Sequence, residues 1–174
     1  MEQSGEKGFK EGLEEKYKYR ERVNEKWGRK FGSQGYSSFS QVQEPKITVT
    51  GYNPAAMLDG KRFCSDLVVE FHDFQADRLR EASPDKFITH NMMGFADKVS
   101  YFDLGKDLEF VSHDQYPGGH FRPTQNILIA DRLAAELDFI RSVKHKSFWI
   151  MEQQSGMTGW EIMGRAPKPG ELGM

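Results

Sequence analysis

Short apolar segments alternate with helix-like stretches in the C-terminal half of the chain, and this alternation limits the fold most strongly. Residues 87–89, 108–112 and 148–151 are the apolar segments. A short helix is expected over 100–107 and a longer one over about 124–142, with one apolar face formed by Ile129, Leu133, Leu137 and Ile140. Apolar strands separated by amphipathic helices indicate parallel βα units, so we predict an α/β fold.

The N-terminal half is more helical and more highly charged. Residues 2–26 mix both signs of charge, and apolar side chains recur four residues apart in two registers, Phe9, Leu13 and Tyr17, then Val23, Trp27 and Phe31. This spacing predicts two amphipathic helices with a break near Tyr19. Residues 32–56 are punctuated by glycine and proline, which favours an irregular surface segment.

A further helix is predicted over 57–82, with Pro84 just beyond its end. The large apolar residues of this stretch predict its buried face, namely Phe63, Leu67, Phe71, Phe74 and Leu79.

Charge and composition exclude several classes of protein. The formal net charge of −2 argues against a partner such as nucleic acid or a membrane surface, which needs a basic patch. No apolar run approaches the ~18–20 residues of a membrane span, and the first ten residues lack the apolar core of a signal peptide. The single cysteine, Cys64, excludes an internal disulfide and a cysteine-rich zinc cluster. We therefore expect a cytoplasmic protein.

Polar residues follow each predicted strand at the point where it ends. Asn91 follows the first strand, Asp114 and Tyr116 the second, and Glu152 the third. Ligand sites of parallel α/β folds form at the carboxyl ends of the strands, so these four residues are the candidate site. A carboxylate directly after a buried strand, as at Glu152, either serves function or caps the next loop.

The remaining candidates are single residues with two interpretations each. His90 and His113 could bind a ligand or form structural hydrogen bonds, and Trp160 could stack on the apolar face of a ring or close the rim. No two of the five histidines are three or four residues apart, and no HExxH or phosphate-binding glycine motif occurs. We therefore expect neither a metal nor a cofactor.

Several motifs together resemble glycoside hydrolase family 42, whose members are retaining β-galactosidases. They occur in chain order at 23–28, 62–66, 79–81, 88–94, 107–117, 148–154, 158–160 and 167–172, and include ITHNMMG, DLEFVSHDQYP and FWIMEQQ. The resemblance implies a partial (β/α)₈ barrel of roughly three βα units from its C-terminal half. It also implies hydrolysis of terminal β-galactosides or galacto-oligosaccharides.

The resemblance also implies roles for individual residues. Glu152 matches the nucleophile that forms a galactosyl-enzyme, Tyr116 matches the tyrosine that orients this carboxylate, and Trp160 matches a tryptophan of the galactose pocket. The full-length enzymes of the family often form trimers, so a homotrimer is expected of the full-length protein.

The chain departs from the family pattern at three points. The general acid/base of the family is a glutamate in an Asn-Glu-Tyr motif, which does not occur here; Asn24-Glu25 is followed by Lys26. Gly32 stands where the family has a tryptophan. The cysteine zinc cluster of some relatives cannot form with one cysteine.

These departures lead us to expect an incomplete catalytic barrel over 1–174, without the N-terminal strands and the last βα unit. A complete barrel takes ~250 residues. Retaining hydrolysis requires two carboxylates roughly 5–5.5 Å apart, and the resemblance supplies only Glu152, so we expect no turnover by the chain alone. The alternative is a non-catalytic remnant that binds a sugar or a partner protein.

Overall fold

The computed structural model describes residues 2–29, 35–45, 53–117, 129–157, 166–167 and 169–170. The chain divides into two compact units, Met1–Val68 and Val69–Met174. Within the described ranges, no helix combines the length and the apolarity that crossing a membrane requires.

The first unit is helical, with α1 (Glu2–Tyr17), α2 (Arg20–Lys26), the short 3₁₀ helix η2 (Phe39–Gln41) and the beginning of α3 (Pro54–Ala82). The predicted break near Tyr19 is confirmed, because Lys18 adopts a positive φ of 63° and ends α1. The core of this unit contains Phe9, Leu13, Val23, Trp27, Val42 and Ala56. Phe31 lies outside the described residues.

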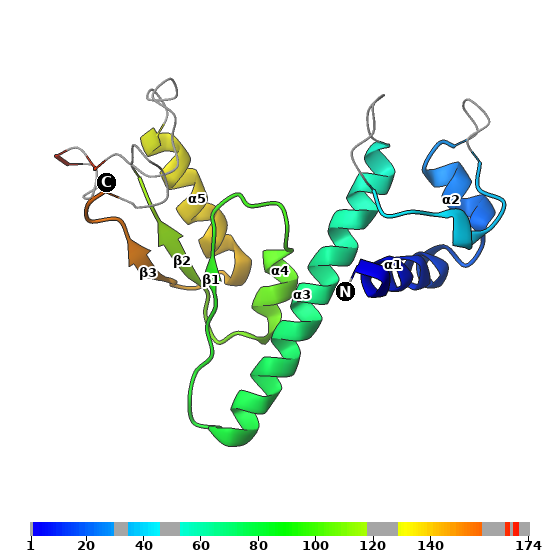
Figure 1. Ribbon diagram of the computed structural model, residues 1–174. Helices are drawn as coiled ribbons and strands as arrows, with labels where there is room; N and C mark the ends of the chain where they lie inside the picture. The colour runs from blue at the N-terminus through cyan, green and yellow to red at the C-terminus, as the bar shows by residue number, and fades with distance from the viewer. Residues whose placement is uncertain are drawn as a thin grey trace. The chain divides into compact units, whose positions relative to one another are not determined.

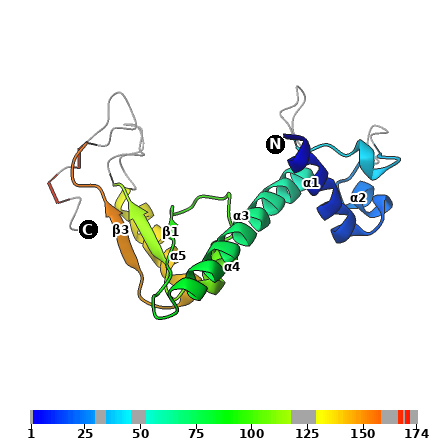
Figure 2. The same ribbon diagram turned by 60° about the horizontal axis from the view of Figure 1, so that its bottom comes forward.

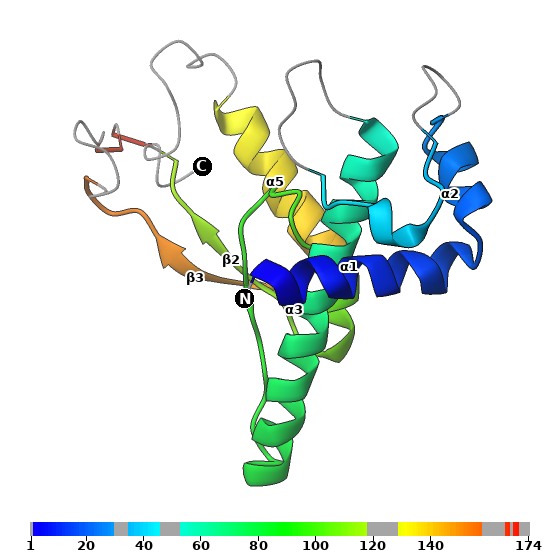
Figure 3. The same cartoon turned by 45° about the vertical axis from the view of Figure 1, so that its right-hand side comes forward.

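A buried carboxylate joins α1 to α3 within the first unit. Asp59 accepts hydrogen bonds from Lys16 Nζ at 2.5 Å, from the Tyr17 hydroxyl at 2.6 Å and from Trp27 Nε1 at 2.9 Å. Phe63, one turn further along α3, packs edge to face on Phe9 with ring centroids 5.5 Å apart. These contacts hold α1 against the N-terminal part of α3 (Figure 3).

The second unit contains a parallel three-stranded sheet in the order β1–β2–β3. Its elements are β1 (Asn91–Met92), α4 (Tyr101–Leu104), the 3₁₀ helix η3 (Gly105–Asp107), β2 (Ser112–Gln115), α5 (Ile129–Lys144) and β3 (Trp149–Gln153). Helix α5 lies along one face of the sheet (Figures 1 and 2). The core of this unit contains Met92, Tyr101, Leu104, Leu108, Val111 and Ile140. The alternation of strands and helices predicted from the sequence is confirmed.

The strands lie a few residues later than predicted. Asn91, Asp114 and Glu152, which we placed after the strands, are members of β1, β2 and β3. The apolar pattern identified the buried approach to each strand. It missed the strand ends because residues with polar side chains at the rim still form the backbone hydrogen bonds of the sheet.

The predicted helix boundaries differ less from those observed. Helix α3 begins at Pro54, where the Asn53 side chain caps it by accepting a hydrogen bond from Ala56 N at 3.0 Å. Helix α5 ends at Lys144, and the predicted residues 124–128 lie outside the described ranges. On α5, Leu133 and Ile140 are buried as predicted.

The predicted buried face of α3 is largely wrong. Leu67, Phe71, Phe74 and Leu79 are exposed, each by about half of its surface, whereas Phe63 packs on the core of the first unit. The buried residues of the helix are Ala56, Asp59, Ser65, His72 and Ala76. Helical periodicity identifies the most apolar face, but it does not say which segments are present to cover that face.

Candidate active site

The carboxyl ends of β2 and β3 are aligned by an irregularity in their pairing. Ser112 and His113 pair with Trp149 and Ile150, but Asp114 pairs with Glu152, so Met151 is left without a partner opposite it. Regular pairing would have placed Met151 beside Asp114. Because side chains alternate between the two faces of a strand, the extra residue brings Glu152 to the face that carries Asp114.

A chain of hydrogen bonds crosses this face from β1 to β2. The Thr89 hydroxyl donates to Ser112 Oγ at 3.3 Å and to the Phe110 carbonyl at 2.9 Å. Ser112 Oγ donates to Asn91 Oδ1 at 3.2 Å, and Asn91 Nδ2 donates to Asp114 Oδ2 at 3.0 Å. The other oxygen, Asp114 Oδ1, is buried and has no hydrogen-bond partner among the described residues.

Tyr116 brings its hydroxyl to the candidate nucleophile. It donates a hydrogen bond to Glu152 Oε2, from β2 to the neighbouring strand β3. The Glu152 side chain is itself exposed, so its carboxylate is both oriented and accessible. Four predicted site residues, Asn91, Asp114, Tyr116 and Glu152, are therefore brought together, whereas Trp160 lies outside the described residues.

The two candidate histidines make structural contacts. His113 is buried, and its Nδ1 lies 2.9 Å from the Met92 carbonyl; His90 Nδ1 lies 2.8 Å from the Asn91 carbonyl. In the described part of the chain, no three His, Cys, Asp or Glu side chains are grouped closely enough to hold a metal ion.

His90 also contacts a buried histidine that sequence reasoning did not single out. The His72 ring packs edge to face on His90 with centroids 5.7 Å apart, and its Nε2 has no hydrogen-bond partner among the described residues. Burial lowers the pKa of His72 below the usual 6.5, and His90 and Arg80 lower it further against the opposite influence of Asp73 and Asp107. The folded protein therefore disfavours a charged His72.

This lowered pKa predicts a loss of stability in mild acid. The unfolded chain binds a proton at His72 near pH 6.5, whereas the folded chain resists it. The stabilisation that neutral His72 contributes is therefore complete above about pH 6.5, and it is lost as the pH falls through the lower pKa of His72 in the folded state. We expect His72→Gln to reduce the difference between urea midpoints measured at about pH 7.5 and about pH 5.5. An unchanged difference would contradict this role.

A glycine and a glutamate that sequence reasoning missed meet beside the rim. Gly94 follows β1 with a φ of +53°, and a Cβ at this position would lie 2.8 Å from Glu136 Cδ. Glu136 is only 7% exposed and pairs with Arg132 Nε at 2.9 Å, one turn away on α5. The i, i+4 spacing of Arg132 and Glu136 was visible in the sequence, but the burial of the carboxylate was not.

We expect Gly94→Ala to lower the unfolding free energy of the second unit by more than the cost of the left-handed backbone conformation alone. The left-handed conformation costs a residue with a Cβ roughly 1–2 kcal/mol, and the contact with Glu136 adds to that cost. Gly28→Ala is the matched control, because Gly28 has a φ of +63° and, among the described residues other than its two chain neighbours, no atom lies within 4 Å of the added Cβ. If denaturant unfolding gives the same loss of unfolding free energy for Gly94→Ala and Gly28→Ala, the contact with Glu136 adds nothing to the cost.

Comparison with known proteins identifies the family. A sequence model of the β-galactosidases of glycoside hydrolase family 42 matches residues 1–174, the whole chain. The chain belongs to glycoside hydrolase family 42. The resemblance read from the motifs is thereby confirmed.

Individual relatives support the family assignment. The β-galactosidase of Thermus thermophilus is 40% identical over 172 residues, covering 93% of this chain and 27% of that protein. Among solved structures, the β-galactosidase of the Antarctic haloarchaeon Halorubrum lacusprofundi matches with a TM-score of 0.86 and 34% identity, over 97% of this chain and 26% of that one. The β-galactosidase of the psychrophilic Marinomonas ef1 matches with a TM-score of 0.83 and 36% identity, over 95% and 27%.

The chain thus spans about a quarter of the length of these family 42 proteins. Its parallel strands and covering helix form part of the (β/α)₈ barrel, which confirms the predicted fold class.

Proposed function

We propose that these 174 residues supply the nucleophile side of a retaining β-galactosidase site. The observation that carries the proposal is the hydrogen bond from Tyr116 to Glu152, in register with Asp114 at the carboxyl ends of neighbouring strands. An exposed carboxylate held by a phenol at the rim of a parallel sheet can attack a sugar and still remain oriented.

In the proposed reaction, a Glu152 oxygen attacks the anomeric carbon of a terminal β-galactoside. The bond from that carbon to the leaving oxygen breaks, and a general acid protonates the leaving group. Water then attacks the galactosyl-enzyme, the same acid group now acts as base, and galactose and the free Glu152 carboxylate result. The Asn-Glu-Tyr motif of the family is absent from this sequence, so we propose that the acid/base lies on a segment outside these residues.

The neighbouring residues hold the nucleophile and the sugar. Tyr116 keeps one Glu152 oxygen fixed while the other attacks. Asn91 fixes Asp114 through one oxygen, and Asp114, paired in the sheet with Glu152, is proposed to contact the galactose. Trp160 is proposed, from the resemblance alone, to stack on the sugar.

We also propose the compartment, the substrate class and the oligomeric state of the full-length enzyme. Residues 1–174 would form an incomplete catalytic barrel of a cytoplasmic enzyme that acts on β-galactosides or galacto-oligosaccharides. The full-length protein would form a homotrimer. The support for these points is the family resemblance.

A chimera tests the proposal. The 172-residue stretch of the Thermus thermophilus β-galactosidase that matches this chain is replaced by this chain, and hydrolysis of nitrophenyl β-galactoside is measured. We expect activity from the chimera and none from the chain alone. A smaller exchange, limited to residues 87–157, keeps the test available if the larger exchange does not fold.

Two outcomes would contradict the proposal. One is a folded chimera without activity. The other is activity of the chain alone that Glu152→Gln removes, since a second carboxylate, Asp114 or Glu161, would then have to act within the chain. Saturable galactose binding by the chain in the absence of an active chimera would favour a non-catalytic remnant.

A further inference from the structure

The strand that carries Asn91 is held in place by side chains as well as by the sheet. β1 contains only Asn91 and Met92, which pair with Ser112 and His113 of β2. A strand of two residues offers few backbone hydrogen bonds to its neighbour. Other contacts must therefore help to fix its position.

Two side chains hold the backbone directly after Asn91. His113 Nδ1 lies 2.9 Å from the Met92 carbonyl, and the next residue, Met93, donates its backbone N–H to the Tyr101 hydroxyl at 2.8 Å. Because a carbonyl oxygen can only accept, the imidazole of His113 donates from Nδ1. One residue is thus held through its carbonyl and the next through its amide.

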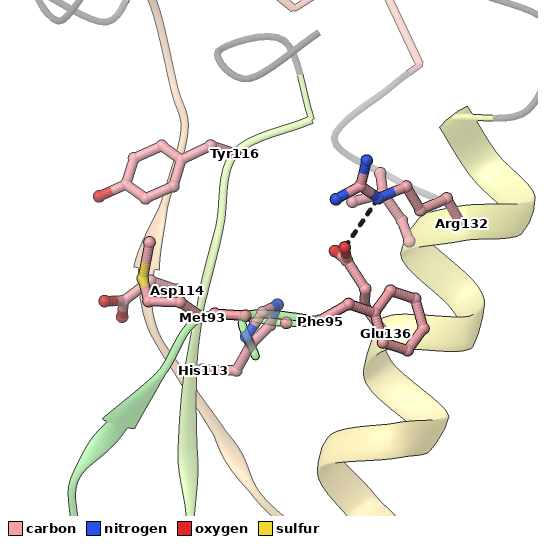
Figure 4. A pocket seen from close by; sticks show the side chains of 10 residues that line it. Met93, Phe95, His113, Asp114, Tyr116, Arg132 and Glu136 are labelled. Atoms are coloured by element: carbon pink, nitrogen blue, oxygen red, sulfur yellow. Dashed lines mark hydrogen bonds and ion pairs between the residues drawn. The ribbon is translucent and has the colours of Figure 1, made fainter. Parts of the chain in front are cut away.

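Both supporting side chains are buried behind the sheet. His113 is 2% exposed and Tyr101 is 7% exposed, and the Tyr101 ring packs on Phe139 of α5 with centroids 6.1 Å apart. Figure 4 shows the His113 ring on the α5 side of β2, whereas Asp114 points to the opposite side. The alternation of side chains along β2 therefore separates the support from the candidate site.

Asn91 connects this support to the candidate site. Its Nδ2 donates to Asp114 Oδ2 at 3.0 Å, and Asp114 pairs with Glu152 in the sheet. A hydrogen bond weakens steeply as its distance and angle depart from the best values. A shift of the Asn91 backbone would therefore release the Asp114 carboxylate.

We infer that Tyr101 and His113 are positioning residues for galactose binding. They fix the backbone after Asn91, and they thereby keep Asn91 bonded to Asp114 without touching the sugar themselves. The inference rests on the proposed function, in which Asp114 contacts the galactose.

Inhibition of the Thermus chimera by free galactose tests this inference. The inhibition constant of galactose against hydrolysis of nitrophenyl β-galactoside measures sugar binding without the chemical step. A variant that only unfolds more readily loses active enzyme and maximal rate, but its remaining sites bind galactose with the same constant. We expect Tyr101→Phe, which removes one hydroxyl, to raise the inhibition constant about fivefold, as for the loss of one hydrogen bond.

A matched pair of substitutions at His113 separates the hydrogen bond from the packing of the ring. Asparagine places an N–H at the same number of bonds from the backbone as Nδ1, whereas leucine cannot donate. We expect His113→Leu to raise the inhibition constant about fivefold, and His113→Asn to stay within about twofold of the unchanged chimera. The control is Phe102→Ala, which removes a half-exposed ring from α4, the helix of Tyr101, and should leave the inhibition constant unchanged.

A double substitution tests whether the support acts through Asn91. Asn91→Ala removes the hydrogen bond to Asp114 itself and should raise the inhibition constant. Adding Tyr101→Phe to this variant should then change the constant by less than about twofold, because residues that act through one contact are not additive.

Three results would overturn the inference. They are an unchanged inhibition constant in both Tyr101→Phe and His113→Leu, equal effects of the two His113 substitutions, and effects of Tyr101→Phe and Asn91→Ala that multiply. A chimera that hydrolyses no galactoside before these residues are changed, or that galactose does not inhibit, would contradict the proposed function instead. The two failures are therefore distinguishable.

Discussion

Replacing Glu152 by Gln is expected to lower kcat of the active chimera by at least about 10⁴-fold, as for removal of a nucleophile in other enzymes. The amide keeps the size of the side chain and can still accept the Tyr116 hydrogen bond, but it cannot form the galactosyl-enzyme. The rate of nitrophenol release checks this prediction, with Asp138→Asn as a control that removes an exposed carboxylate elsewhere.

A second variant identifies the kind of role that Glu152 has. With Glu152→Gly, added azide should restore activity, because a small anion can occupy the space of the lost carboxylate and attack the anomeric carbon itself. A single displacement inverts that carbon, so the product should be the α-galactosyl azide. Restoration with a β product, or full activity of Glu152→Gln, would show that Glu152 is not the nucleophile.

The second large effect concerns stability and the first unit. Asp59→Ala is expected to lower the free energy of unfolding of the first unit by about 2–4 kcal/mol. A buried donor left without a partner costs roughly 1–3 kcal/mol, and this substitution leaves two such donors. The indole of Trp27 is buried and loses its acceptor, and the Tyr17 hydroxyl loses one as well, whereas the half-exposed Lys16 ammonium can return to water.

Chemical denaturation followed by Trp27 fluorescence measures this loss, in a background where Trp149 and Trp160 are replaced by Phe. Asp66→Ala is the matched control, an exposed acid on the same helix that should cost less than about 0.5 kcal/mol. Similar losses from the two variants would contradict the account of Asp59.

The same carboxylate predicts a loss of stability in acid. Burial alone would raise the pKa of Asp59, but the hydrogen bonds from Lys16, Tyr17 and Trp27 outweigh it and hold the pKa below its usual value of 3.8. The stabilisation is therefore present above about pH 4 and is lost as the pH falls through the lower pKa of the folded state. Asp59→Ala should lack this component.

Much of the site could be predicted because topology alone brings its residues together. Parallel strands carry the residues at their carboxyl ends to one rim, so Asn91, Asp114 and Glu152 had to lie near one another once the βα alternation was recognised. Tyr116, two residues beyond Asp114, had to lie near the same rim.

The details that make the site work depend on backbone geometry that composition does not encode. The unpaired Met151 sets which face carries Glu152, and no residue type marks such an irregularity in advance. The burial of Glu136 depends on the path of the chain at Gly94. On α3, the apolar stripe was correctly found but wrongly assigned to the interior, because burial depends on the neighbouring segments rather than on the helix itself.

Trapping the covalent intermediate tests the central claim most directly. A 2-fluorogalactosyl donor with a good leaving group slows both displacements but hydrolysis more, so the galactosyl-enzyme accumulates and can be located by mass spectrometry of peptides from the chimera. We predict that the fluorogalactosyl group is attached to Glu152. Attachment to another carboxylate, such as Asp114 or Glu161, or the absence of any adduct in an enzyme that turns over, would contradict the account.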